Sequence, residues 1–480
     1  MRLSGIFLAF FYSILYNLIT VCYERGINMD QSNQTPPNRP NPRRRKRDPK
    51  RIFMEAYLPV IIAAGVMLLI VALIVTSCVQ RQQEDARKAS LAALENDDQQ
   101  SAQAAKAADC IARAKAVAAT YDFQGAIDVL DSFQGDIYAY DEMLVLRDEW
   151  KHTMENLVEF TPEQVVNLSV QVLIAEADRA FADQNYGSSY KKNFITTDEF
   201  SNLLDQLYSG GYVLVDMDDL VTESSSDGST FYTAKTVSLP QGKKPLMLTQ
   251  TQVNYYTYMV DPDGDGVADK NGAGFASRLI LENGELKNEL VTADGETVVG
   301  NYDLVPILED FLKDHPDFSY HGARPILAVT GYNGIFGYRN DTLSDVSPIL
   351  EELRDRGYTV AFYTYANSDY NASTVAQIEK EIKSWKENIV PVLGHTDMLV
   401  YARSADIAAP GNYSGEKFTT LQNAGFRYYL GFCTNGEPWF VAGNTYIRQG
   451  RIMVSAANLQ DKADWFAGIC DPAAVLVETR

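Results

Sequence analysis

The sequence predicts an α/β protein, a distorted (β/α) barrel preceded by one transmembrane helix and a helical stalk. Residues 57–79 form a nearly uninterrupted apolar segment. Residues 80–160 contain no proline and place apolar side chains at helical spacing. From residue 161 to residue 480, apolar strand-like segments alternate with amphipathic helices, which is typical of a parallel sheet that is open or closed into a barrel. With this many repeats over about 320 residues, the barrel is favoured.

The apolar segment 57–79 is long enough to cross a bilayer. At about 1.5 Å per residue, a helix of this length spans roughly 34 Å. Seven basic residues lie immediately before it, within residues 43–51. Because basic residues stay on the cytoplasmic side, residues 1–56 are expected in the cytoplasm and the C-terminal domain outside it. The chain is therefore predicted to be a single-pass cell-membrane protein.

A second apolar segment covers residues 3–22, and a cleaved signal peptide or another span are its alternatives. No small-residue cleavage site precedes the polar run 31–41, and Met29 would be a natural start for a protein with one span. Residues 1–28 are therefore interpreted as a mis-assigned start.

The charge is distributed unevenly along the chain. The net charge is -21, but residues 1–80 hold ten basic and four acidic residues, so the remainder has 32 basic and 59 acidic residues and a net charge of -27. Nucleic acids and anionic polymers are bound by basic surfaces. The acidic ectodomain is therefore not expected to bind nucleic acid, or an anionic polymer by charge alone.

The segment 80–160 is predicted to be a helical stalk. One stretch, with apolar residues at 126, 127, 129 and 130, looks like a single tetratricopeptide-type unit. A single unit cannot bury its own faces, so a spacer or small helical hairpin is favoured over a peptide-binding array. The five cysteines have no metal-ligand spacing, and Cys433 and Cys470 are equally compatible with a disulfide or with two free thiols.

The strands and helices of the C-terminal domain 161–480 follow each other regularly. A capping box formed by Thr196 and Glu199 predicts a helix through Tyr208. Further helices are expected at residues 304–312, 347–357, 373–388 and 418–423. Strands are expected in the segments YVLVDM, KPLMLT, RPILAVTG, YTVAFYTY, DMLVYA and FRYYLGF.

The region from about residue 170 onward resembles the polysaccharide deacetylase family, in particular its membrane-anchored extracytoplasmic members. The resemblance is carried by TTDEFSNLLDQLYSGGYVLVDMDDL, KKPLMLTQTQVNYYTYM, GAGFASRLIL, YDLVPILEDFLKDHPDFSYHGARPILAVTGYNGIFGYR and GFRYYLGF. It implies a deacetylase-type barrel and hydrolysis of sugar N-acetyl groups by a metal-bound water, with one Asp and two His as ligands and a carboxylate base.

The positions that would carry this chemistry are changed. Thr251 and Gln252 occupy the sites of the family's paired aspartates, and Tyr363 and Asn367 occupy those of its two histidines. A third motif is replaced at residues 402–404. Amide and phenol groups are poor ligands for zinc and cannot act as a carboxylate base. The resemblance therefore implies a pseudoenzyme without catalytic zinc or another divalent metal.

Relocated ligands are the alternative. The four histidines (152, 315, 321 and 395) lie in the stalk, at a helix end or in loops before strands, away from the strand ends where barrel enzymes place their chemistry. Asp216, Asp218, Asp219 and Asp369 follow strands and could rebuild a metal site, although such acids commonly cap turns.

A separate metal motif lies in DPDGDGVAD. Asp261, Asp263, Asp265 and Asp269 occupy positions 1, 3, 5 and 9 of a calcium loop, and Val267 would offer its carbonyl at position 7. Position 12 is Gly272, so the bidentate Glu of a full EF-hand is missing. We expect a structural calcium site, with a solvated acidic turn as the alternative.

Together these features predict a cell-envelope protein whose deacetylase-like ectodomain is inactive and binds a glycan or acts as a scaffold. Tyr255, Tyr256, Tyr363, Tyr365 and Arg403 are expected at the mouth of the former active site. The alternatives are an active metal-dependent polysaccharide deacetylase with relocated ligands and a purely structural ectodomain.

Overall fold

The computed structural model describes residues 12–13, 16, 54, 57–264 and 267–477. The expectations for the start region 1–28, for the basic residues within 43–51, for nearly all of the cytoplasmic segment and for Asp265 lie outside these residues. The chain divides into two compact units, Met1–Asp97 and Asp98–Arg480.

One helix, α3 (Leu58–Ala119), contains the apolar segment. Among the described residues it is the one helix long and apolar enough to span a membrane, with a mean hydropathy of 3.1 over its most apolar window. α3 continues without interruption for 62 residues, so the apolar segment and the first part of the expected helical stalk form one helix. The orientation across a membrane stays a prediction.

The end of α3 belongs to a small helical core. Ala107, Cys110 and Ala114 are buried in one apolar cluster with residues of α4 (Phe123–Asp131) and α5 (Asp141–Glu155), among them Trp150. Asp122 caps α4 by accepting a hydrogen bond from the Gly125 amide at 2.8 Å. The second compact unit therefore begins inside the expected stalk. This part of the stalk is a helical hairpin with its own apolar core.

Seven parallel strands close into a barrel, as the sequence predicted. Their order around the barrel is β2, β7, β11, β12, β13, β14 and β16, and β16 pairs with β2 again. Their bounds are β2 Val166–Gln171, β7 Lys244–Thr251, β11 Ile326–Val329, β12 Thr359–Phe362, β13 Met398–Val400, β14 Tyr428–Phe432 and β16 Tyr446–Met453. All these pairings are parallel, so the carboxyl ends of the strands lie at one end of the barrel.

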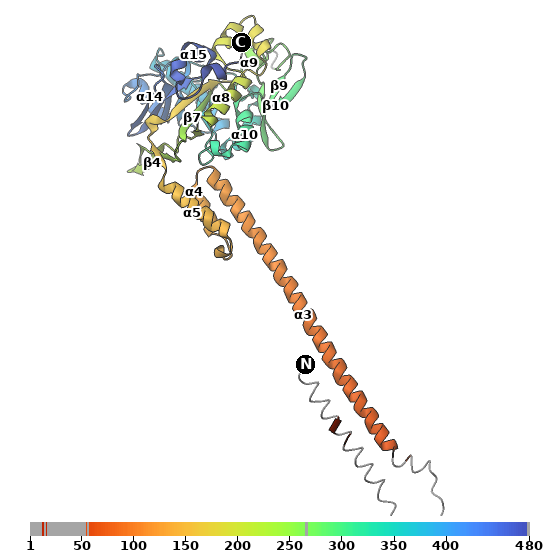
Figure 1. The fold of residues 1–480 in the computed structure, drawn as a ribbon. Helices are drawn as coiled ribbons and strands as arrows, with labels where there is room; N and C mark the ends of the chain where they lie inside the picture. The colour runs from red at the N-terminus through yellow and green to blue at the C-terminus, as the bar shows by residue number, and fades with distance from the viewer. Residues whose placement is uncertain (1–11, 14–15, 17–53, 55–56, 265–266, 478–480) are drawn as a thin grey trace, which may run out of the picture. The chain divides into compact units, whose positions relative to one another are not determined.

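Helices surround the barrel (Figure 1). The five longest are those the sequence predicted: α8 Thr197–Ser209, α10 Leu304–Asp314, α11 Ser347–Asp355, α12 Val375–Asn388 and α14 Glu416–Ala424. The capping box of Thr196 and Glu199 at the start of α8 is present. Shorter helices are α6 Ala177–Ala182, α7 Gly187–Asn193, α9 Thr257–Val260, α13 Val390–Leu393, α15 Ala456–Asp461 and α16 Pro472–Val475.

The remaining strands lie outside the closed barrel. β3 (Tyr212–Leu214) pairs with the first residues of β7, and β15 (Phe440–Gly443) pairs with β16. β1 (Val158–Phe160) pairs with β6 (Val237–Leu239), and β4 (Val221–Ser226) pairs with β5 (Ser229–Ala234). A three-stranded sheet of β8 (Arg278–Glu282), β9 (Glu285–Val291) and β10 (Thr297–Gly300) belongs to the segment between β7 and β11.

The barrel interior changes from apolar to polar along its axis. Near the amino ends of the strands, Met247, Ile326 and Ile447 pack with Val215 and Met217, which follow β3 and fill that end. Further along, the interior carries hydrogen-bonded polar side chains. The Asn167 amide donates to Gln449 Oε1 at 2.9 Å, and the Thr249 hydroxyl donates to Asn167 Oδ1 at 2.9 Å. The closed end is therefore apolar, and polarity increases toward the carboxyl ends.

A buried carboxylate joins three elements on the outside of the barrel. Glu309 of α10 accepts hydrogen bonds from Arg324 at 2.6 Å, from Arg356 at 2.7 Å and from the Tyr358 hydroxyl at 2.9 Å. Burial alone would raise the pKa of Glu309, but the hydrogen bonds and charges of the two arginines outweigh burial, and the pKa is lowered.

Candidate functional site

A cavity of about 520 Å³ opens at the carboxyl ends of the barrel strands. Gln171, Phe432 and Met453 are the last residues of β2, β14 and β16, and all three line it. The other lining residues are Asn193, Gln252, Tyr363, Asn367, Arg403, Ser404, Cys433, Thr434, Ser455, Ala457, Asn458, Lys462 and Trp465. The cavity is therefore at the end of the barrel where (β/α) barrels place ligands.

Three of the four substituted family positions meet in this cavity. Gln252, just after β7, donates a hydrogen bond from its amide to Gln171 Oε1 at 2.8 Å. Tyr363 and Asn367 line the wall after β12. Thr251 is buried beneath them, with its side chain against the Tyr363 hydroxyl and its own hydroxyl donating to the Val170 carbonyl at 3.3 Å.

The lining residues do not fit a zinc ion or another catalytic divalent metal. The described residues that line the cavity include no Asp, Glu or His. The only thiol among them belongs to Cys433, and burial raises the pKa of that thiol to about 12, so it is not a thiolate at neutral pH. Catalytic zinc sites are built from imidazole, carboxylate or thiolate ligands. These side chains therefore supply neither a ligand set nor a carboxylate base.

Several lining residues have left-handed backbone conformations. The φ angles are 61° for Gln252, 55° for Asn367, 56° for Arg403 and 57° for Ser404. Such conformations cost on the order of 1–3 kcal/mol for residues other than glycine, and they concentrate at functional sites. Asn367 also buries its Oδ1 atom, which has no hydrogen-bond partner among the described residues. The cavity wall thus has a strained backbone and a buried hydrogen-bond acceptor, Asn367 Oδ1, that has no partner among the described residues.

Three of the five residues expected at the mouth of the former active site are not part of the cavity lining. Tyr255 is fully buried and donates a hydrogen bond to Asp303 at 2.7 Å. Tyr256 is buried against the Thr330 hydroxyl at 3.1 Å, and the Tyr365 hydroxyl accepts a hydrogen bond from Asn388. None of these three tyrosines is among the residues that line this cavity, and their role in ligand binding stays a prediction. Arg403 does line it, as does Tyr363.

Besides Tyr363, the aromatic side chains that line the cavity are Trp465 and Phe432. Trp465 is half-buried, and the Lys462 ammonium lies 3.8 Å from the centre of its ring. Lys462 and Trp465 both belong to the last segment of the chain, after α15. The sequence analysis missed them because no local pattern marks this segment as part of a site at the barrel mouth.

The acids considered for a relocated metal site do not join the cavity. Asp216 and Asp219 exchange hydrogen bonds with each other's backbone amides at 3.0 Å. Burial raises the pKa of Asp219 to about 7, with a contribution from the charge of Asp216. Asp369 accepts a hydrogen bond from the Ala372 amide at 2.8 Å, as a turn-capping acid does. None of these acids is part of the cavity lining.

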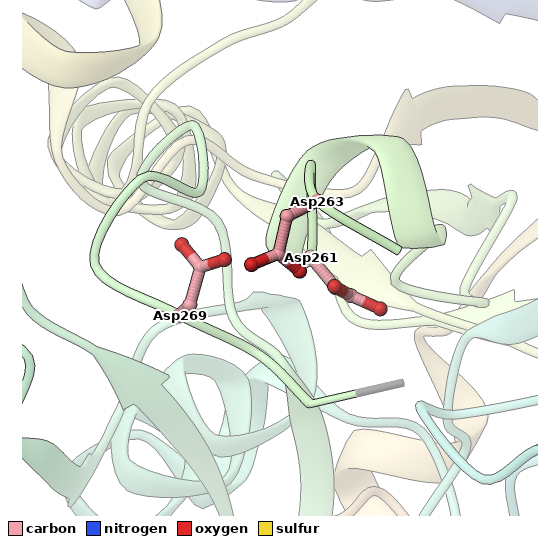
Figure 2. Close-up of side chains that lie close together, drawn as sticks. All are labelled: Asp261, Asp263 and Asp269. Carbon is pink, nitrogen blue, oxygen red and sulfur yellow. The ribbon is translucent and has the colours of Figure 1, made fainter. Parts of the chain in front are cut away.

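A group of three carboxylates forms in the acidic loop after α9. One oxygen atom from each of Asp261, Asp263 and Asp269 lies within 4.8 Å of the others. Figure 2 shows these three side chains close together. The Gly264 amide donates to Asp261 Oδ1 at 3.0 Å and tightens the turn. Asp269 Oδ2 is buried without a hydrogen-bond partner among the described residues. Among those residues, this is the one group of three or more His, Cys, Asp and Glu side chains that could hold a metal ion.

The cysteines in the described part of the chain, at positions 78, 110, 433 and 470, are free. Of the two alternatives for Cys433 and Cys470, the structure therefore has free thiols.

No family model matches the chain, and no curated protein matches it. Among solved structures, the deacetylase PplD of Streptococcus pyogenes, in complex with acetate, is similar at 12% sequence identity. The similarity covers 64% of this chain and 96% of that chain, with a TM-score of 0.31. The low TM-score leaves the function to be argued from the side chains of the cavity. The resemblance to the polysaccharide deacetylase family stays a prediction.

Proposed function

We propose that this chain is a membrane-anchored envelope protein whose barrel cavity binds a glycan without hydrolysing it. The observation that carries this proposal is the chemistry of the cavity lining, which is rich in amides and hydroxyls but has no carboxylate or imidazole among its described residues. Amide side chains both donate and accept hydrogen bonds, which matches the hydroxyl and acetamido groups of sugars. A carboxylate-free and imidazole-free wall supports binding over metal-assisted hydrolysis.

The arrangement of these groups also supports a sugar ligand. Trp465 offers an aromatic ring in the cavity wall, on which the apolar face of a sugar ring can pack. The buried Asn367 Oδ1 is an acceptor that a sugar hydroxyl or amide could satisfy. The strained turn at Arg403 and Ser404 holds two further polar groups over the same space.

The test is sugar binding by the full-length protein in nanodiscs of zwitterionic lipid, measured by calorimetry with chitin oligomers and soluble peptidoglycan fragments. We expect binding without acetate release. Trp465→Ala should weaken the binding about five- to tenfold through loss of ring packing. Phe231→Ala, which removes an exposed aromatic ring on β5, is the matched control and should leave binding unchanged.

The metal content of the same preparation separates this function from the alternative enzyme. One equivalent of bound zinc, together with acetate release that stops upon chelation, would overturn the proposal and favour a deacetylase with relocated ligands. Absence of sugar binding together with absence of zinc would instead favour a purely structural ectodomain.

We also infer a structural role for calcium in the acidic loop. Three carboxylates from one short loop meet within a few ångströms, in the order and spacing of a calcium loop. Like charges held this close repel one another unless a cation or protons compensate them. A bound calcium ion would order the loop and the insert that follows it, without taking part in the cavity.

A further inference from the structure

We propose that the sugar bound in the cavity carries a negative charge, as a carboxylate or as a phosphate or sulfate ester. This inference rests on the proposed glycan-binding function and adds the chemical class of the ligand. It opposes the expectation from net charge, because the ectodomain as a whole is acidic.

The cavity wall contains positive charges and no opposing ones. Arg403 and Lys462 are the charged residues among those that line it. Within the described part of the chain, neither of them forms an ion pair with a carboxylate; Lys462 instead packs on Trp465. By contrast, Arg448 in the same barrel is paired with Asp406 at 2.9 Å. The charges of Arg403 and Lys462 are therefore available to a ligand.

A third cation lies directly behind the cavity wall. Arg451 is completely buried, and its guanidinium donates hydrogen bonds to the Ser169 hydroxyl at 2.9 Å and to the carbonyls of Tyr401 at 3.0 Å and Gly431 at 3.2 Å. All three acceptors are neutral. Burial lowers the pKa of Arg451 to about 10, so this side chain still carries its charge at neutral pH.

The groups around Arg451 do not neutralise it. The ring of Phe432 lies 4.3 Å from the guanidinium of Arg451. The phenol of Tyr363 and the thiol of Cys433 are titratable groups close enough to act on Arg451. Both groups are uncharged at neutral pH because burial raises their pKa values. The carboxylate that acts on Arg451, that of Asp406, is already hydrogen-bonded to Arg448. Phe432, Tyr363 and Cys433 line the cavity, so the charge of Arg451 is felt there.

Local charge outweighs the acidic surface at this site. At physiological ionic strength, the field of exposed charges is screened over about 8 Å, whereas a buried charge is screened much less. The net charge of -27 beyond residue 80 therefore slows the approach of an anion but does not set its affinity once it is inside the cavity. Arginine pairs readily with carboxylate and phosphate oxygens, and the amides remain for the sugar hydroxyls.

The test compares matched sugars on the full-length protein in zwitterionic nanodiscs by calorimetry. Three oligosaccharides of equal length are used: one neutral, one with a uronic acid in place of the neutral sugar, and one with a phosphate ester. We expect at least one charged sugar to bind about tenfold more tightly than the neutral one, which is the value of one charge-assisted hydrogen bond. The uronic acid and the phosphate ester distinguish the two sources of charge.

Substitutions locate the effect. Arg403→Gln together with Lys462→Gln should lower the preference for the charged sugar, measured as the ratio of its affinity to that of the neutral sugar, because only Arg451 then remains as a cation at the cavity. Arg113→Gln with Lys115→Gln removes the same charge from α3, and it should leave this ratio unchanged. Equal affinity for neutral and charged sugars in the natural protein would overturn this inference but leave the proposed function standing. An undiminished ratio in the Arg403 and Lys462 double variant would also overturn it, and failure to bind any sugar would overturn the proposed function itself.

Discussion

Removing calcium ligands from the acidic loop should remove a calcium-dependent gain in stability. The perturbation is Asp263→Ala together with Asp265→Ala. Asp263 is an exposed member of the carboxylate group, so its replacement leaves the buried Asp261 and its hydrogen bond to the Gly264 amide in place. The double variant should therefore fold, yet it keeps too few carboxylates to hold a calcium ion.

The size of the effect follows from linkage between binding and folding. A ligand that binds only the folded state stabilises it by RT ln(1 + [L]/Kd). At roughly 1 mM calcium and a Kd of roughly 0.1 mM, values typical of an extracellular site, the gain is about 1.4 kcal/mol. For the unit Asp98–Arg480, with an unfolding entropy of about 2.1 cal/mol/K per residue, that gain corresponds to a rise in Tm of about 2 °C.

Thermal unfolding of the full-length protein with calcium, and after chelation, measures this difference. The natural chain should show the rise, and the double variant should show none. Asp98→Ala with Asp294→Ala removes the same charge from two exposed positions outside the loop and should keep the full rise. A double variant that still responds to calcium would refute the assignment of the loop as the site.

Three further outcomes are expected. Glu309→Gln should lower the free energy of unfolding by about 2–4 kcal/mol in urea titrations, because it leaves two half-buried arginines with a weakened partner. The pKa of Glu309 is lowered in the folded state. Its contribution to stability is therefore fully present above the unfolded pKa of about 4.5 and is lost as the pH falls through the folded pKa. Gln252→Asp with Tyr363→His and Asn367→His should create zinc binding, detected by metal analysis, if these three side chains converge as the cavity indicates. An external protease should digest everything beyond about residue 80 in intact spheroplasts, and protection of the C-terminus would contradict the predicted orientation.

The barrel was predictable from sequence because its signals are local. Buried strands such as β7 begin with short apolar runs, and the capping box at Thr196 and Glu199 marks a helix start. The barrel strands β2 and β16 were not among the expected strands. The small hairpins were not predicted, since strands such as Val221–Ser226 are mostly exposed and lack an apolar pattern. The sequence did not indicate that α3 is continuous, because the composition changes from apolar to polar near residue 80. Such a change does not interrupt a helix, since the backbone hydrogen bonds of a helix are formed within it.

The candidate site was predictable only in part. Gln252, Tyr363 and Asn367 were found through the family resemblance, and the barrel brings all three to one cavity. Tyr255, expected at the mouth, is buried and donates a hydrogen bond to Asp303, a contact that no local sequence pattern indicates. Trp465 reaches the cavity from nearly three hundred residues beyond the first barrel strand, by tertiary contacts that carry no local signal.

The apolar cluster around Val215 and Met217 closes the amino end of the barrel, so the barrel is open at its carboxyl end alone. A polymer cannot thread through it and must come and go by the single mouth. Tyr363, which lines the cavity and is almost completely buried, would then be reached only by a chain terminus or a side branch. Under the proposed glycan binding, occupancy of the cavity should follow the number of ends and branches that a glycan offers, and an unbranched glycan should occupy it less than a branched glycan of the same mass.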